Sequence, residues 1–378
     1  MSGRLPLAVC TAVLAVRAVL SPGAAVAAPE PPEPGARSVA ELLTDLQRLY
    51  REAERATEAY NATEERLKEK RAEVARLDGE LVRARLALRD SRGAAGRLAR
   101  QQYQSSTDIS PYVRLLLARD PQHALEQGRV IGRLTRERAA TTTRLAGAEH
   151  RRDTLARRAR AALDAQLTLT ERRKKERDDV RRRLDEVTEL LASIDADRLR
   201  KLAEFERDGI AERQEEFLAS GALSDDGKPS AAGDRALRYA VRQLGKPYEW
   251  GAEGPEAYDC SGLTSTAWER AGTPIPRTSQ EQWAELPRVP LSELRPGDLV
   301  VYFPEATHVA MYLGDGMVVQ APRPGARVKV SPIAANPVLG AVRPDPDGEP
   351  LRRYTPPELP ESALDGSDEG YASADAPD

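Results

Sequence analysis

Two long runs without proline, at residues 38–103 and 122–218, place the strongest constraint on how this chain of 378 residues folds. Proline breaks helices, so its absence over such lengths permits two very long helices. Apolar residues recur in both runs at coiled-coil spacing, which predicts amphipathic helices paired as an antiparallel hairpin. The repeats are Leu67, Val74, Leu81 and Leu88 with Leu77 and Ala84 in the first run, and Val180, Leu184, Val187, Leu191 and Ile194 in the second.

The segment between the two runs should form the tip of this helical arm, which we assign to residues 38–219. The tip carries an apolar patch: Ile109, Tyr112, Val113, Leu115, Leu116 and Leu117. Apolar side chains at a hairpin tip have little core to join, which favours a docking or inhibitory role. A plain spacer is the alternative. Glycines and charged residues interrupt both repeats, so the helices should pair imperfectly and be able to re-pair.

The N-terminal segment predicts export. Arg4 precedes an apolar run from residue 5 to 20, and small residues follow up to Ala27, as in a secretory signal peptide at residues 1–27. An uncleaved membrane anchor is the alternative, although the run is short for a membrane span and contains Arg17. Residues 28–37 then form a Pro-rich leader. We expect a secreted, extracellular protein.

Composition excludes several classes of function. Charged residues make up 31% of the chain, but the net charge is only −3, and no basic block with interleaved aromatics indicates nucleic-acid binding. No His or Cys cluster predicts a metal site, and no Gly-rich phosphate loop predicts a nucleotide, so we expect no metal and no cofactor.

The polar residues 220–230 read as a linker, and the acidic, Pro-rich residues 344–378 as a disordered tail.

Cys260 is the one cysteine that remains once residues 1–27 are removed. It begins a predicted helix in which Leu263, Ala267 and Ala271 share a face. A helix N-terminus favours thiolate over thiol, as a nucleophilic sulfur requires. The alternative is a small buried apolar side chain.

His308 is the only histidine in the same region, and a base next to a thiol is the minimum needed for thiol catalysis. It begins an alternating run typical of a strand. A turn at residues 314–316 then leads to Gln320, which a hairpin would place beside His308. The amide oxygen of Gln320 could then accept a hydrogen bond from the imidazole and fix its tautomer.

The region 231–343 reads as an α+β domain, because predicted helices come first and a run of antiparallel strands follows. Helices are expected at residues 231–244 and 263–272. Strands are expected at residues 299–303, 309–313, 317–320, 327–330 and 338–342.

Several motifs in this region occur together and in an order that resembles the NlpC/P60 family. They are residues 244–248 (LGKPY), 250–251 (WG), 259–262 (DCSG), 276–279 (PRTS), 296–299 (PGDL) and 308–314 (HVAMYLG). The resemblance implies a papain-like α+β fold and a cysteine peptidase that cuts peptidoglycan stem peptides in the cell wall, at the link between D-glutamate and the diamino acid. It also implies Cys260 as nucleophile and His308 as base. Gln320 stands where the family often has histidine or an acid.

The same resemblance assigns substrate contacts. Tyr248 would bind the scissile carbonyl or the substrate, or close the core with its ring. Asp259 and Ser261 would line the substrate groove. Arg277 would pair with a stem-peptide carboxylate, or be a surface charge. The arm is similar to helical regulatory regions of division-associated wall hydrolases, which implies a membrane-embedded division-complex partner.

Two other functions fit the same residues. An amidase or acyltransferase could use the same cysteine and histidine. A coiled-coil scaffold whose C-terminal domain only binds the wall is the non-enzymatic alternative.

Overall fold

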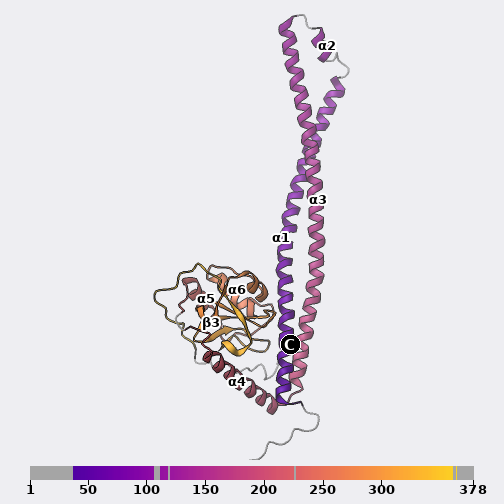
Figure 1. The fold of residues 1–378 in the computed structure, drawn as a ribbon. Coiled ribbons are helices and arrows are strands. Elements are labelled where there is room, and N and C mark those ends of the chain that lie inside the picture. Colours follow the sequence, from indigo (N-terminus) through magenta and orange to yellow (C-terminus); the bar gives the residue numbers. More distant parts are fainter. Residues whose placement is uncertain (1–36, 106–110, 118–119, 225–226, 361–362, 364–378) are drawn as a thin grey trace, which may run out of the picture. The chain divides into compact units, whose positions relative to one another are not determined.

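The computed structural model describes residues 37–105, 111–117, 120–224, 227–360 and 363. The expected signal peptide and nearly all of the leader lie outside these ranges. Two very long helices, α1 (Val39–Ser105) and α3 (Pro121–Ala192), lie side by side and antiparallel (Figure 1). The short helix α2 (Pro111–Leu116) lies in the connection between them. The predicted helical hairpin is therefore confirmed.

The second proline-free run does not form one helix. It breaks at residues 193–195, and a separate helix, α4 (Ala196–Ala219), begins where the Asp195 carboxylate accepts a hydrogen bond from the Arg198 N–H at 2.9 Å. Helix α4 leaves the hairpin and packs on the C-terminal domain. The Gln214 amide donates to the Gly316 carbonyl at 2.9 Å, and the ring of Phe217 joins an apolar cluster of the sheet. The need to cover this cluster explains the break.

The C-terminal domain has three helices and a six-stranded antiparallel sheet, in agreement with the predicted α+β class. The sheet order is β1-β6-β2-β3-β4-β5. The helices are α5 (Ala231–Val241), α6 (Cys260–Arg270) and α7 (Ser279–Glu285). The strands are β1 (Arg288–Val289), β2 (Leu299–Tyr302), β3 (His308–Gly314), β4 (Met317–Gln320), β5 (Lys329–Pro332) and β6 (Val338–Val342). Two 3₁₀ helices, η1 (Leu291–Glu293) and η2 (Ile333–Ala335), lie in the connections.

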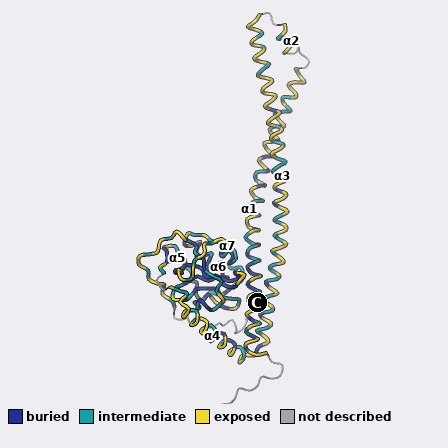
Figure 2. The backbone as a smooth tube through the Cα atoms, viewed as in Figure 1, coloured by how far each residue is buried: buried dark blue, intermediate teal, exposed yellow. Residues whose placement is uncertain are grey.

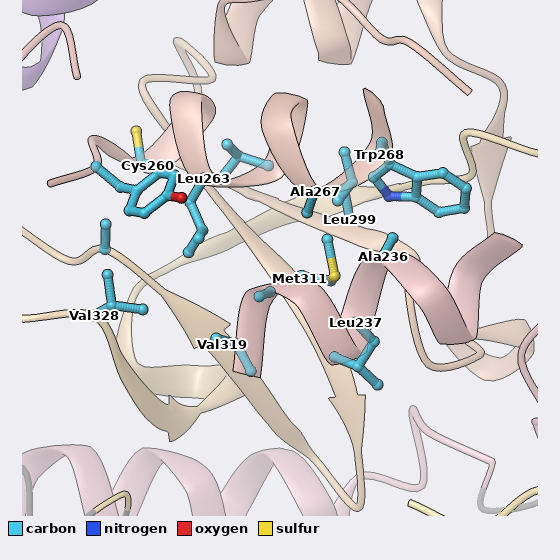
Figure 3. Packing of buried hydrophobic residues seen from close by; sticks show 14 of the residues in the cluster. Ala236, Leu237, Cys260, Leu263, Ala267, Trp268, Leu299, Met311, Val319 and Val328 are labelled. Atoms are coloured by element: carbon cyan, nitrogen blue, oxygen red, sulfur yellow. The ribbon is translucent and has the colours of Figure 1, made fainter. Parts of the chain in front are cut away.

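Helices α5 and α6 cover one face of the sheet. Figure 3 shows Leu237 of α5 and Trp268 of α6 packed with Met311 of β3, and all three side chains are fully buried. Burying a large apolar side chain contributes roughly 1.5–3 kcal/mol. The core therefore fixes α6 against β3, and with it the N-terminus of α6 that carries Cys260.

The arm is buried unevenly along its length (Figure 2). Near its base, Leu46 and Leu49 of α1 pack with Val187 of α3 and Leu202 of α4. A second cluster around Leu77 joins α1 to α3 farther along. Towards the tip most apolar side chains are exposed, among them Tyr112, Val113, Leu116 and Leu117. Ile109 of the predicted apolar patch lies outside the described residues.

Part of the acidic tail is ordered. The backbone N–H of Leu351 donates to the Pro229 carbonyl at 2.9 Å, and Arg295 pairs with Asp345 at 2.7 Å. Leu359 packs against the main core of the domain. Residues 344–360, which composition alone assigns to a disordered tail, therefore extend the folded domain, because they supply apolar and hydrogen-bonding groups that it buries. No helix in the described part of the chain is long and apolar enough to cross a membrane.

Candidate active site

Cys260 is the first residue of α6, as predicted. The Asp259 carboxylate caps this helix by accepting a hydrogen bond from the Gly262 N–H at 2.6 Å. An aspartate at this position satisfies a backbone donor that the helix cannot use internally. The cap fixes where α6 begins and holds Cys260 at its positive end. The backbone N–H of Val309, next to His308, stabilises the charged form of the sulfur.

His308 and Gln320 form the predicted pair. His308 begins β3 and Gln320 ends β4, and the imidazole Nε2 lies 2.6 Å from the Gln320 Oε1. We assign Nε2–H as the donor, because an amide oxygen can only accept. This assignment leaves Nδ1 of a neutral ring free to take a proton. Both side chains are buried, and the Tyr302 ring lies 5.6 Å from the imidazole, centroid to centroid.

Two carboxylates of helix α1 reach this site from the arm. The Oε1 of Glu58 lies 3.8 Å from the Cys260 sulfur and accepts a hydrogen bond from the Ser261 hydroxyl at 2.7 Å. Its Oε2 accepts from the backbone N–H of Ser279 at 2.8 Å. Ser261 and Ser279 thus form a carboxylate cradle beside the thiol, and Glu58 fills it.

Glu54, one turn earlier in α1, lies against the histidine. Its Oε1 is 3.2 Å from the His308 Nδ1, close enough for an ion pair when the ring is protonated, although the alignment is not that of a good hydrogen bond. The arm therefore contacts both members of the candidate catalytic dyad, Cys260 and His308. Glu58 faces the sulfur, and Glu54 faces the nitrogen that would accept the proton of the thiol.

Two further contacts extend this interface. The Asn61 amide of α1 donates to the Asp259 Oδ2 at 3.0 Å. The Tyr60 ring meets the Trp250 ring edge-on, with centroids 5.1 Å apart. Glu54, Glu58 and Asn61 recur at helical spacing and so share one face of α1.

The predicted substrate-contacting residues lie together but differ in setting. Tyr248, Asp259, Ser261 and Arg277 are all buried. Arg277 binds Asp259 through two nitrogens, at 2.7 and 3.0 Å, and also donates to the Ser261 hydroxyl at 2.8 Å. Asp259 and Arg277 thus form an ion pair next to the cradle. Among these four residues, the Ser261 hydroxyl is the group that contacts the arm carboxylate directly.

Burial under the arm changes the electrostatics of the site. Burial, then the carboxylates of Glu58 and Asp259, raise the pKa of the Cys260 thiol well above its ordinary value. Burial and Asp259 also raise the pKa of Glu58 from 4.5 to about 7. Burial alone would lower the pKa of His308, but Glu54 and the hydrogen bond to Gln320 outweigh it and raise that pKa. The covered site therefore holds a neutral thiol, although a helix N-terminus by itself favours the thiolate.

Sequence reasoning did not find Glu54, Glu58 and Asn61. One signal was present: between Leu49 and Leu67 the first run has no Leu, Val, Ile or Met, and alanines occupy several core positions instead. Small side chains allow another surface to approach closely. The periodicity shows that large aliphatic side chains are missing from this stretch, but it does not show which surface packs against the small ones.

Known proteins identify the domain. The model of the NlpC/P60 family matches residues 245–340, which include Cys260, His308 and Gln320. The C-terminal domain of this chain therefore belongs to the NlpC/P60 family. The described residues hold no group of three or more His, Cys, Asp or Glu side chains that could bind a metal ion.

Similar proteins are named as endopeptidases or peptidoglycan hydrolases. A probable endopeptidase of Corynebacterium glutamicum is 49% identical over 94 residues, which cover 25% of this chain and 45% of that protein. The peptidoglycan endopeptidase RipA of Mycolicibacterium smegmatis is 37% identical over 123 residues, 28% of this chain and 25% of that protein. The crystal structure of the NlpC/p60 domain of the peptidoglycan hydrolase SagA is 31% identical, with a TM-score of 0.28, over 29% of this chain and 97% of that one. The match thus spans less than half the length of either endopeptidase.

Proposed function

We propose that this protein is a secreted, wall-associated cysteine endopeptidase that hydrolyses peptidoglycan stem peptides, at the link between D-glutamate and the diamino acid. Two observations carry the proposal. Cys260 stands at the start of α6 with its sulfur beside the backbone N–H of Val309, and the preceding residue, His308, is hydrogen-bonded to Gln320. The names of the relatives that share this domain support the same activity.

The chemistry follows from these groups. The Nδ1 of His308 takes the proton of the Cys260 thiol, and the sulfur attacks the scissile carbonyl. The backbone N–H of Cys260, at the helix start, stabilises the oxyanion. The imidazolium then gives its proton to the leaving amine as the C–N bond breaks and a thioester forms. Water, deprotonated by the same imidazole, hydrolyses the thioester and regenerates the thiol. Gln320 keeps the ring in the required tautomer throughout.

The carboxylate cradle supports an acidic substrate. In the structure the Ser261 hydroxyl and the Ser279 N–H hold a glutamate carboxylate 3.8 Å from the sulfur. A D-glutamyl residue linked through its side chain keeps its own α-carboxylate next to the bond to be cut. We assign the cradle to that carboxylate, so Glu58 of the arm would stand in for the substrate. Asp259 and Arg277 position the cradle from below, and Tyr248 closes the adjoining wall.

The arm acts as an inhibitor in this proposal. Glu58 occupies the cradle, and Glu54 places a carboxylate against the nitrogen that must accept the thiol proton. Substrate and arm cannot both fill the cradle. A partner that binds the open state more tightly would shift the population toward activity. The exposed apolar residues near the tip offer such a partner a contact, and a membrane-embedded division protein is the partner we assign to them.

Mass spectrometry of digested muropeptides tests the activity. We expect two new kinds of fragment: one that ends in D-glutamate and one that begins with the diamino acid. An amidase would instead free the stem from the glycan, an acyltransferase would add a group, and a scaffold would leave the muropeptides intact. Any of these three outcomes would contradict the proposal.

Gln320→Ala should lower kcat about tenfold, a much smaller loss than that of His308→Ala. The neutral amide only orients the ring, whereas the imidazole carries the proton. Steady-state kinetics on a soluble stem peptide would measure both variants. Equal losses would mean that Gln320 does more than orient His308.

Raising the pH should release the arm. Closure raises the pKa of Glu58 from 4.5 to about 7, so the closed state retains a proton that the open state gives up. The free energy that favours closure is therefore largest below 4.5 and is lost as the pH rises through about 7. The raised pKa of His308, which faces Glu54, acts in the same direction. Asp259 and Arg277 also face Glu58, but they form an ion pair with each other.

The accessibility of Cys260 measures this release. Its alkylation rate by iodoacetamide should rise between about pH 5 and pH 8 more steeply than thiolate formation alone requires. Glu54→Ala combined with Glu58→Ala should remove the extra steepness. If the native protein and this variant gave parallel pH profiles, opening of the arm would not be linked to the loss of a proton.

A further inference from the structure

The charge of the helical arm changes along its length. Its distal half, which we define as residues 81–160 and which includes the tip, contains eighteen arginines, no lysine, and seven aspartates and glutamates, for a net charge of +11. The rest of the hairpin, residues 39–80 and 161–192, contains sixteen cations and nineteen acids, for a net charge of −3. The excess positive charge of the arm is therefore confined to this distal arm.

The arginines of the distal arm face solvent. Within α1 and α3 all of them are exposed except Arg152, which is half-buried. Some are paired: Arg92 contacts Glu149 at 3.1 Å, and Arg152 contacts Asp153 at 2.9 Å. If every acid of the distal arm held one arginine, arginines would still outnumber acids by eleven. The distal arm therefore presents a strongly positive surface, however its own charges pair.

Exposed apolar side chains gather in the same part of the arm. Of the fourteen large apolar residues that are exposed in the described part of the chain, ten lie between Val82 and Leu134. Leu116, which ends α2, is 84% exposed, and Leu117 is 67% exposed. Figure 2 shows the same contrast between the exposed distal arm and the buried positions near the base of the hairpin. The tip thus combines leucines in solvent with an arginine-rich shaft.

This combination favours one kind of binding partner. A guanidinium group binds phosphate through two parallel N–H donors. A soluble anionic polymer would engage the arginines but would leave the leucines in water. The surface of a bilayer with anionic lipids offers both contacts, because phosphate headgroups lie directly above an apolar layer. Exposed leucines and arginines in one segment therefore favour a lipid surface over a soluble polyanion.

We propose that the distal arm binds the surface of a membrane that contains anionic lipids. Leu116 and Leu117 enter the boundary between headgroups and acyl chains, and the arginines of the adjoining turns of α1 and α3 bind the headgroups. These arginines are Arg97, Arg100, Arg129 and Arg133. The inference rests on the proposed function for its setting, an exported protein beside the cell membrane, but its test needs no hydrolysis. The membrane-embedded partner assigned to the tip would lie in the same membrane, so the two contacts are compatible.

The lipid contact and the active site are far apart on the arm. Ser105, the last residue of α1, is 47 residues beyond Glu58, which occupies the carboxylate cradle. At a rise of 1.5 Å per residue this separation is about 70 Å along the helix. Substitutions in the distal arm should therefore change lipid binding without changing hydrolysis of a soluble stem peptide.

Co-sedimentation with vesicles tests the inference. The mature chain, residues 28–378, is the protein to use, because the apolar run at residues 5–20 would itself bind lipid. One set of vesicles consists of phosphatidylcholine, and the other of phosphatidylcholine and phosphatidylglycerol in equal parts. The native chain should bind the anionic vesicles at least about tenfold more strongly than the neutral ones. Higher ionic strength should reduce this ratio.

Two variants separate the charged contact from the apolar one. Leu116→Ser combined with Leu117→Ser should lower binding to the anionic vesicles about tenfold, because two apolar anchors are lost. Replacing the four arginines next to the tip by glutamine should lower binding to the anionic vesicles to that of the neutral ones. These changes are Arg97→Gln, Arg100→Gln, Arg129→Gln and Arg133→Gln.

Each variant has a matched control in the other half of the hairpin. Leu163→Ser combined with Leu167→Ser replaces two exposed leucines of α3 outside the distal arm. A second control removes four exposed cations by Arg66→Gln, Arg71→Gln, Lys174→Gln and Lys175→Gln. Both controls should bind vesicles as the native chain does. Equal losses in the controls and the test variants would overturn the assignment to the distal arm.

Three other results would overturn the inference. If the native chain bound both kinds of vesicle equally, or neither, the distal arm would not recognise anionic lipid and its partner would be a protein. If the leucine variant bound like the native chain and free polyphosphate displaced both, the ligand would be a soluble polyanion. Hydrolysis of a soluble stem peptide by the same preparations tests the proposed function separately, so a failure of one does not imply a failure of the other.

Discussion

Replacing both Glu54 and Glu58 by alanine should raise hydrolysis of a soluble stem peptide by about two orders of magnitude. The double change removes the carboxylate from the Ser261–Ser279 cradle and the ion pair with His308. Two contacts of about 1.5 kcal/mol each suffice for such a shift between closed and open states. Alanine is the best helix former, so α1 should stay intact. Cys260 should also become much more reactive towards iodoacetamide.

A matched double variant separates release of the arm from a general loss of acidic charge. Glu65→Ala with Glu69→Ala removes two glutamates at the same i,i+4 spacing of α1, outside the contacts with the active site. It should leave hydrolysis and alkylation unchanged. A soluble peptide is the right substrate, because docking of the arm to the wall cannot contribute to its cleavage. If the native protein and the variant with Glu54→Ala and Glu58→Ala hydrolysed the soluble peptide at equal rates, the arm would be a spacer or a docking rod and not an inhibitor.

The sequence predicts the parts of the site whose determinants are local. The start of α6 at Cys260 depends on the adjacent Asp259 cap, and the approach of Gln320 to His308 depends on a short hairpin. Both are set within about a dozen residues. Heptad spacing likewise predicts the pairing of α1 with α3. Such short-range rules need no knowledge of the rest of the chain.

The contacts that cover the site are long-range, and local patterns do not report them. Glu58 and Ser261 are 203 positions apart in the chain. In the sequence Glu58 looks like one more charged residue on a solvated helix. The same limit hides the break between α3 and α4: the repeat continues through Ile194, and only the apolar face of the sheet explains why α4 turns away with Phe217.

Cys260→Ala should abolish hydrolysis, with a loss of at least about 10⁴-fold, because no other group in the site can form the thioester. The fold should survive, since the sulfur lies at a helix start and the core beneath it consists of Leu263, Ala267 and Trp268. The thermal midpoint should therefore change by only a few degrees. Residual release of muropeptide fragments by this variant would rule out the thiol mechanism.

The same variant shows which group holds the arm. Glu58 is 3.8 Å from the sulfur but within 2.8 Å of its two donors in the cradle, so the thiol adds little to closure. Cys260→Ala should therefore stay closed, and limited proteolysis of α1 should match that of the native protein. Ser261→Ala removes one cradle donor and should open the arm, which would make α1 more sensitive to protease. If Cys260→Ala opened the arm instead, the thiol rather than the carboxylate cradle would be the lock.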